Sequence, residues 1–110
     1  MFEKFNPHHP NIVAERHELG SALIAHGEAA AAAAELAQAD ADANPAEINP
    51  LELAQLRDAR SRALVQSKGD RALARKLAAD ALQIYERSAP TTPKFQTERA
   101  EIEAWLRRLS

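Results

Sequence analysis

The stretch PNIVAERHELGSAL at residues 10–23 decides the fold, because the stretch PKFQTERAEIEAWL at residues 93–106 repeats its pattern. The two stretches share a leading proline, a Glu-Arg pair, a later glutamate and two aliphatic positions at a constant offset of 83 residues. Pro50 stands between them, 40 residues after Pro10 and 43 residues before Pro93. A period of about 42 residues is typical of stacked helical repeats, which bind partners along one face. The pattern therefore favours a binding module over an enzyme.

The composition indicates an all-α domain. The chain has 110 residues, of which 45% are hydrophobic and only 5% are aromatic, and alanine supplies much of the apolar content. A sequence rich in alanine and leucine, with three glycines and few β-branched residues, favours helix over strand. Its length suits one domain with a modest core. We expect an extended segment at residues 1–9 and a single helical domain at residues 10–110.

Hydrophobic periodicity and turn residues predict five helices. We expect them at residues 10–26, 28–41, 50–68, 70–87 and 93–109. Gly27 and Gly69 mark the turns inside two helical hairpins, because glycine commonly ends a helix. The hairpins, residues 10–42 and 50–87, cannot bury their apolar faces alone. The predicted architecture is therefore two stacked antiparallel hairpins plus a terminal capping helix. In the first hairpin the expected packing residues are Ile12, Leu19, Leu23, Ala32, Leu36 and Ala39, with Val13 and Ala22 as further candidates.

This arrangement resembles the tetratricopeptide repeat. In that family a Leu-Gly pair lies on the first helix, and small residues flank a large residue on the second. Leu19-Gly20 is followed here by Ala32, Leu36 and Ala39, in matching order and spacing. The second unit is degenerate: Ala74, Ala78 and Ala81 take the second-helix places, and Ser61 or Arg62 stands near the glycine position.

Two further features are similar to particular groups within that family. The long period and the His9-Pro10 pair resemble the kinesin-light-chain variety of the repeat. Residues 69–85, followed by residues 99–106, look like the carboxy-terminal repeats of bacterial eukaryote-like serine/threonine protein kinases. A kinase's own sequence signatures, such as a glycine-rich loop or an Asp-Phe-Gly triplet, are absent. The resemblance implies a scaffold or sensor domain of a larger bacterial signalling protein.

The same resemblance implies that the first helix of each pair lines a groove for a protein or peptide partner. In that register the groove residues are His17, Ser21, Asp58, Arg62 and Gln66. Arg62 is the strongest single candidate, because arginine fits a carboxylate or a phosphate and is enriched in binding hot spots. The Lys/Asn clamp that some family members use for a carboxy-terminal carboxylate is missing, so we do not expect chaperone-tail binding.

No residue pattern in the sequence predicts catalysis, a cofactor or a metal site. The four histidines never stand four residues apart, and the chain has no cysteine. Glu98, Glu101 and Glu103 stand in a solvated helical pattern beside Arg99 and Arg107, which favours ion pairs along the helix over acid–base chemistry. We also expect Trp105 to belong to the core or the end cap.

The net charge of −2 gives no argument for nucleic acid or an anionic membrane as a partner. Its distribution is uneven, since residues 1–49 carry −6 and residues 50–110 carry +4. This asymmetry could join two copies in a homo-dimer, so the alternative function is homo-oligomerisation; differently solvated faces would also explain it. No apolar run reaches the roughly 20 residues of a membrane span, which favours a cytoplasmic location.

Basic residues are frequent on the third and fourth predicted helices. They form a stretch that could receive an acidic or phosphorylated segment, or that could simply be a solvated face. The residues concerned are Arg57, Arg60, Arg62, Lys68, Arg71, Arg75 and Lys76.

Overall fold

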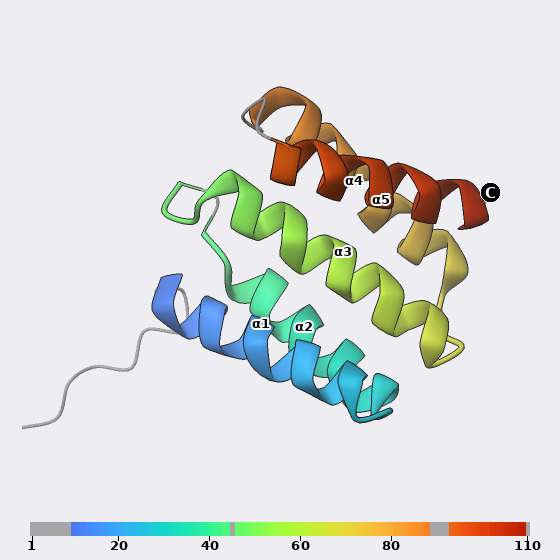
Figure 1. Ribbon diagram of the computed structural model, residues 1–110. Coiled ribbons are helices and arrows are strands. Elements are labelled where there is room, and N and C mark those ends of the chain that lie inside the picture. The colour runs from blue at the N-terminus through green and yellow to red at the C-terminus, as the bar shows by residue number, and fades with distance from the viewer. Residues whose placement is uncertain (1–9, 45, 89–92, 110) are drawn as a thin grey trace, which may run out of the picture.

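The computed structural model describes residues 10–44, 46–88 and 93–109, which form helices and no strand. The five helices are α1 (Pro10–Ala25), α2 (Ala29–Asp42), α3 (Pro50–Gln66), α4 (Arg71–Ser88) and α5 (Pro93–Leu109). They pack in sequence order, each antiparallel to the one before (Figure 1). The prediction of an all-α chain of five helices is confirmed, with every helix end within two residues of its expected position. The extended segment expected at residues 1–9 lies outside the described residues.

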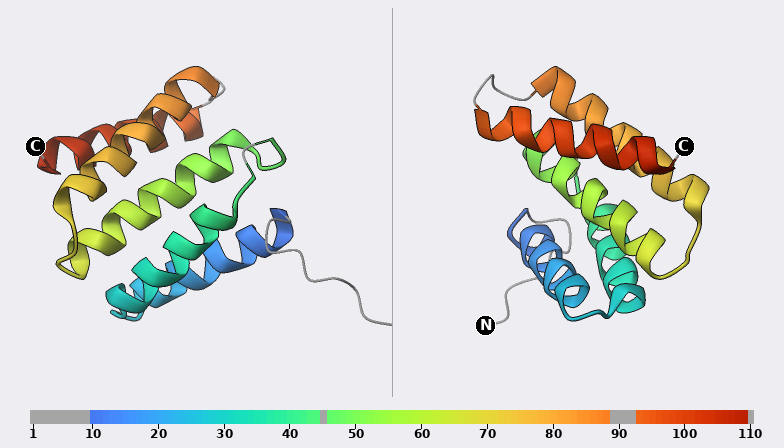
Figure 2. Two further views of the ribbon diagram at one scale, coloured as in Figure 1. Left: turned by 180° about the vertical axis from the view of Figure 1, so that it is seen from behind. Right: turned by 45° about the vertical axis from the view of Figure 1, so that its right-hand side comes forward.

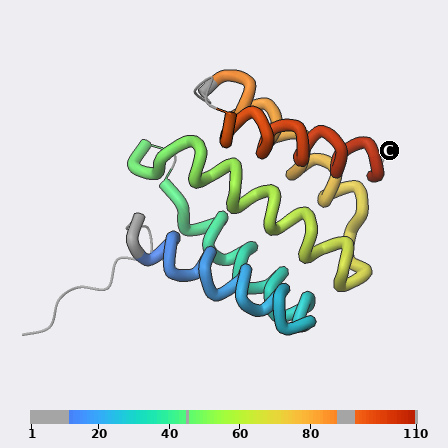
Figure 3. Tube along the Cα trace, viewed as in Figure 1, coloured from blue at the N-terminus to red at the C-terminus, as the bar shows by residue number. Residues whose placement is uncertain are grey.

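The helices lie in two layers. Helices α1, α3 and α5 lie on one side, and α2 and α4 lie behind them, as the view from the back also shows (Figures 1 and 2). Within the first layer the three helices run side by side in roughly the same direction (Figure 3). We call the surface that these three helices present the α1–α3–α5 face.

The two hairpin turns have the same hydrogen-bond pattern. After α1, the N–H of Glu28 donates to the carbonyl of Leu23 at 2.8 Å, and Gly27 adopts the left-handed conformation with φ of 79°. After α3, the N–H of Gly69 donates to the carbonyl of Leu64 at 2.7 Å. This is the glycine-type helix ending known as the Schellman motif.

The second turn differs from the first in one respect. The sequence predicts that Gly69 is the residue that ends the helix, but Lys68 takes the left-handed place, with φ of 59°. The reason is that the motif needs its left-handed residue one position before the residue that donates back to the helix, and Gly69 is the donor. Lys68 therefore adopts a conformation that a side chain disfavours.

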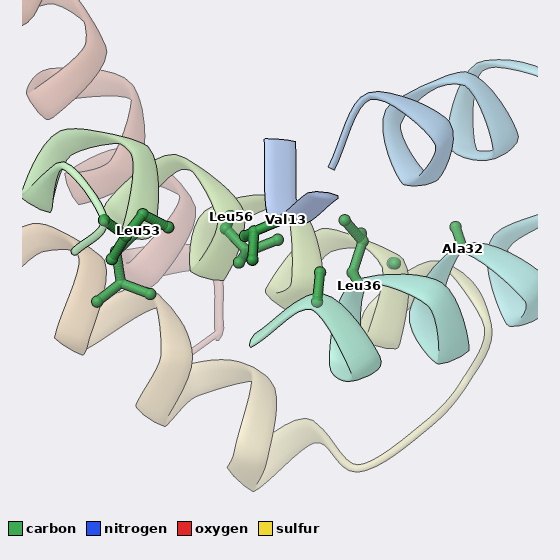
Figure 4. Close-up of a cluster of buried hydrophobic side chains, with 8 residues drawn as sticks. Val13, Ala32, Leu36, Leu53 and Leu56 are labelled. Atoms are coloured by element: carbon green, nitrogen blue, oxygen red, sulfur yellow. The ribbon is translucent and has the colours of Figure 1, made fainter. Parts of the chain in front are cut away.

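A close approach between α1 and α2 organises the core of the first hairpin. Gly20 is buried, and a Cβ atom at this position would overlap the side chain of Leu36. Ala32 and Ala39, one turn on either side of Leu36, are fully buried, as predicted. Figure 4 shows this apolar cluster, which continues onto α3. Its buried members are Val13, Ala32, Leu36, Ala39, Ile48, Leu53, Leu56 and Ala63.

The expectation that Leu19 belongs to the core is wrong. Its side chain is 49% exposed, whereas Val13 is only 1% exposed. Val13 and Gly20 are seven residues apart and therefore share one face of α1. Leu19 lies about 100° around the helix from Gly20, away from the side of α1 that packs against Leu36.

A buried hydroxyl occupies the corresponding place between α3 and α4. Ser61 is fully buried, and its hydroxyl donates to the carbonyl of Ala74 at 2.7 Å. Ala74 and Ala78 are also fully buried and pack against Leu109 of α5. Ser61 is thus a small, buried residue at the contact between α3 and α4.

We predict that Ala32→Leu destabilises the domain by roughly 1–3 kcal/mol, because the added carbons have no space where α2 meets its neighbours. The matched control is Ala31→Leu, since Ala31 is exposed on the same helix. Chemical denaturation of the two variants should show a lower midpoint for Ala32→Leu alone. Equal midpoints would contradict the packing described for α2.

Candidate functional site

The expected groove residues lie on the helices of the α1–α3–α5 face. The Nδ1 atom of His17 on α1 lies 3.1 Å from Oε1 of Glu52 on α3. Because a carboxylate only accepts, the Nδ1–H of His17 is the donor. Ser21 is exposed on α1, and Gln66 is exposed at the end of α3. The contact between His17 and Glu52 therefore joins the two helices that are expected to line the groove.

Asp58 and Arg62 form an ion pair on α3. The Nε atom of Arg62 lies 3.1 Å from Oδ2 and 3.2 Å from Oδ1 of Asp58. The guanidinium carbon of Arg62 also lies 4.8 Å from the ring centre of Trp105 on α5, within the range of a cation–π interaction. Arg62 therefore contacts both Asp58 and Trp105, although 36% of its side chain stays exposed.

Trp105 connects α5 to the buried hydroxyl of the second hairpin. Its indole N–H donates to Oγ of Ser61 at 2.9 Å, and Ser61 in turn donates to Ala74. The ring also packs against the cluster of Ala74, Ala78 and Leu109. The assignment of Trp105 to the end of the core is thus confirmed, but the same residue supports Arg62 at the surface.

A hollow of about 160 Å³ lies beside Asp58, where α3, α4 and α5 meet. Three carboxylates line it, from Asp58 on α3 and from Glu98 and Glu101 on α5. Sequence reasoning assigned the two glutamates to solvated ion pairs, although their spacing of three residues already places them on one helix face. The complete lining is Gln55, Asp58, Tyr85, Glu98, Glu101 and Ile102.

Tyr85 fixes one wall of this hollow. Its ring is almost fully buried, and its hydroxyl donates to Oε2 of Glu98 at 2.8 Å. Burial, together with the hydrogen bond to Glu98, raises the pKa of Tyr85 to about 12. The phenol therefore stays protonated at neutral pH and orients Glu98. Of the expected ion pairs on α5, Arg99 forms one with Glu103 at 3.8 Å.

The surroundings of Asp58 shift the pKa of its carboxyl group. Burial raises its pKa above the ordinary value of 3.8, and the negative charges of Glu101 and Glu98 raise it further. The attraction and hydrogen bond of Arg62 oppose this rise without cancelling it. The lining of the hollow therefore contains three carboxylates and no basic side chain, and Arg62 pairs with Asp58 from outside the lining.

The basic stretch expected along α3 is divided between two sides of the helix. Arg57 and Arg60 point toward α2, where their nitrogens lie 3.6 Å and 3.1 Å from the carboxylate of Asp40. Arg62 lies on the α1–α3–α5 face instead. Arg57, Arg60 and Arg62 therefore do not form the continuous basic surface along α3 that their sequence order suggested.

Three general observations complete the description of the site. Within residues 10–44, 46–88 and 93–109, no helix combines the length and hydropathy that crossing a membrane requires. In the same residues, no three His, Asp or Glu side chains are grouped so that they could hold a metal ion. Comparisons with models of protein families, with curated proteins and with solved structures find no match. A functional assignment therefore depends on the geometry of the α1–α3–α5 face.

We predict that the carboxyl group of Asp58 titrates above pH 3.8, its ordinary value. Glu101→Gln should lower the titration midpoint by removing a repelling charge, and Arg62→Gln should raise it by removing an attracting one. Carbon-detected NMR of the side-chain carboxyl measures all three midpoints. A midpoint at or below 3.8 in the wild type would contradict the described burial.

The same pKa shift makes a prediction about stability. Because the folded-state pKa is raised, the contribution of Asp58 to stability is full below about pH 3.8 and declines as the pH rises through the folded-state pKa. The difference in unfolding free energy between the wild type and Asp58→Asn should change in that direction across this window. Denaturation series at several pH values measure it, and a difference that does not vary with pH would refute the assignment.

Proposed function

We propose that this chain is a non-catalytic protein-interaction module of the tetratricopeptide type, and that its α1–α3–α5 face receives a segment of a partner protein. The observation that carries the proposal is the layering of the helices. The first helix of each hairpin and α5 share one face, and the polar side chains that join these helices lie on it. In tetratricopeptide repeats that layer is the binding layer.

The charge of this face supports a basic partner segment. Asp58, Glu98 and Glu101 contribute three carboxylates to the hollow, and Arg62 is paired with the first of them. A basic side chain of a partner would add an attractive charge beside Asp58, whose pKa is raised mainly by burial and further by the negative charges of Glu101 and Glu98. A lysine or arginine of the partner fits the hollow beside Asp58, because the lining presents acceptors and the aliphatic Ile102 together.

Arg62 has a different role in this proposal from the direct anion contact that the sequence suggests. Its guanidinium is already bonded to Asp58 and lies over Trp105. We assign it the task of holding Asp58 and the α3–α5 junction in place. His17, Ser21 and Gln66 extend the same face along α1 and toward the end of α3, where a longer partner segment would continue.

The resemblance to repeats of bacterial serine/threonine kinases supports a place in a larger signalling protein. In such a protein this domain would recognise a partner, and catalysis would belong to another domain. The proposed binding partner is therefore a protein or peptide, and the proposal includes no cofactor.

We predict that selection on this chain from a random peptide library enriches peptides rich in lysine and arginine. Glu101→Gln should weaken their binding by about 1 kcal/mol, a roughly fivefold rise in Kd, because Glu101 is an exposed carboxylate at the hollow. Raising the salt concentration should weaken binding to the wild type in the same direction. Fluorescence anisotropy of a labelled selected peptide measures both effects.

Glu103→Gln is the matched control, since Glu103 lies on the same helix but pairs with Arg99. It should leave binding of the peptide unchanged. Enrichment of acidic peptides, or an equal loss in both variants, would refute the proposed face.

A further inference from the structure

The exposed charges of the folded chain are separated between its two ends. Among residues 12–44, every exposed charged side chain is acidic, and these are Glu15, Glu18 and Glu28. The one arginine in this range, Arg16, is turned toward Asp42 of α2, with which it pairs at 2.8 Å. The α1 end of the molecule is therefore acidic on its outer surface.

Basic residues outnumber acidic ones on the exposed surface of the opposite end, where Asp70, Glu86 and Glu101 are the exposed acids. Arg71 of α4 donates to the carbonyl of Arg108 at 3.0 Å, so the start of α4 and the end of α5 are adjacent. Figure 1 shows that α5 and α1 lie at opposite ends of the bundle. The exposed basic residues around the contact between α4 and α5 are Lys68, Arg71, Arg75, Lys76, Arg107 and Arg108.

Each end also has an exposed apolar feature. Leu19 is a large hydrophobic side chain that protrudes from the acidic end, 49% exposed. At the basic end a hollow of about 340 Å³ lies between α4 and α5, and its apolar lining consists of Ala79, Leu82 and Leu106. Asp80, Gln83 and Glu86 complete the lining. The side chain of Leu19 from one copy could therefore pack against the alanine and leucine side chains that line the hollow of another copy.

When Leu19 of one copy is placed at the hollow of another, charged residues on α1 of the first copy lie opposite charged residues on α4 of the second. Glu15 precedes Leu19 by four residues, and Arg75 precedes Ala79 by four residues, which is about 6 Å along each helix. If α1 of one copy runs parallel to α4 of another, Glu15 therefore meets Arg75. Seven residues further along each chain, His26 meets Glu86, and both are exposed.

We propose that this chain self-associates head to tail, with Leu19 of one copy seated in the hollow between α4 and α5 of the next. The two contacting surfaces are different, so every pair leaves one acidic end and one basic end free. The assembly therefore grows into longer chains of copies as concentration rises. The contact uses neither Asp58 nor Glu101, so it is independent of the peptide-binding face.

Two variants test the proposal by blocking one end each. Leu19→Glu puts a negative charge on the side chain that would enter the hollow beside Asp80 and Glu86, and Ala79→Glu puts a negative charge in the hollow itself. The two introduced charges repel each other, so the two blocked ends cannot join in a mixture. Both positions are exposed, so folding should be preserved and circular dichroism checks it. The matched controls are Ala25→Glu on α1 and Ala104→Glu on α5, which are exposed and lie outside the two contact surfaces.

Sedimentation velocity of the full chain at low salt gives the decisive readout. The wild type and both controls should show concentration-dependent association that weakens toward about 0.5 M salt. Each end variant alone should be monomeric, with association weakened at least about tenfold. An equimolar mixture of the two end variants should form a one-to-one complex and nothing larger, because each supplies the end that the other lacks.

Three results would overturn the proposal. A wild type that stays monomeric at every concentration excludes self-association. Association that persists in the end variants, or that the controls weaken equally, places the contact elsewhere. A mixture that stays monomeric while the wild type associates indicates a symmetric contact instead of a head-to-tail one.

Discussion

The rest of this structure depends on a steric constraint: two helices of a hairpin pack closely only where one of them has almost no side chain at the crossing. Gly20 meets this condition in the first hairpin, where Leu36 fills the space that a Cβ atom would need. Ser61 meets it in the second, at the cost of a buried hydroxyl that must be hydrogen-bonded. Its bonds to Ala74 and Trp105 satisfy that requirement and attach α5 to the pair. Ser61, at the contact between α3 and α4, therefore helps to fix the position of α5, which forms one border of the α1–α3–α5 face.

Ion pairs between neighbouring helices determine which charged side chains remain exposed on the surface. Asp40 lies between Arg57 and Arg60, and the three link α2 to α3. Removing charges from water offsets much of the attraction, so these pairs specify how the hairpins meet more than they add stability. They also withdraw two arginines from the surface of α3. The acidic α1 end, the acidic hollow beside Asp58 and the basic end formed by α4 and α5 are what this internal pairing leaves exposed.

The local features of the fold could be predicted from the sequence, whereas features that depend on neighbouring helices could not. Periodicity, prolines and turn residues located five helices, and the small residues located Ala32 and Ala39 in the core. Leu19 was misassigned because a helical pattern does not reveal which flank a neighbour covers. The site divides in the same way. The resemblance to the tetratricopeptide repeat suggested His17, Asp58 and Arg62 as site residues. The contact between Tyr85 and Glu98 depends on how α4 and α5 are placed, which the sequence pattern does not give. Likewise, nothing in the order of Arg57 and Arg62 indicates that they lie on opposite sides of α3.

Trp105 gives this molecule an optical property of its own. It is the chain's single tryptophan, its indole nitrogen is bonded to a buried hydroxyl, and a guanidinium covers its ring. When the indole is excited selectively, the emission therefore originates at the junction of α3 and α5. Any ligand that displaces Arg62 or shifts α5 changes the polarity around that one fluorophore. The chain thus contains an intrinsic reporter for the occupancy of its own surface, and no dye needs to be attached to follow it.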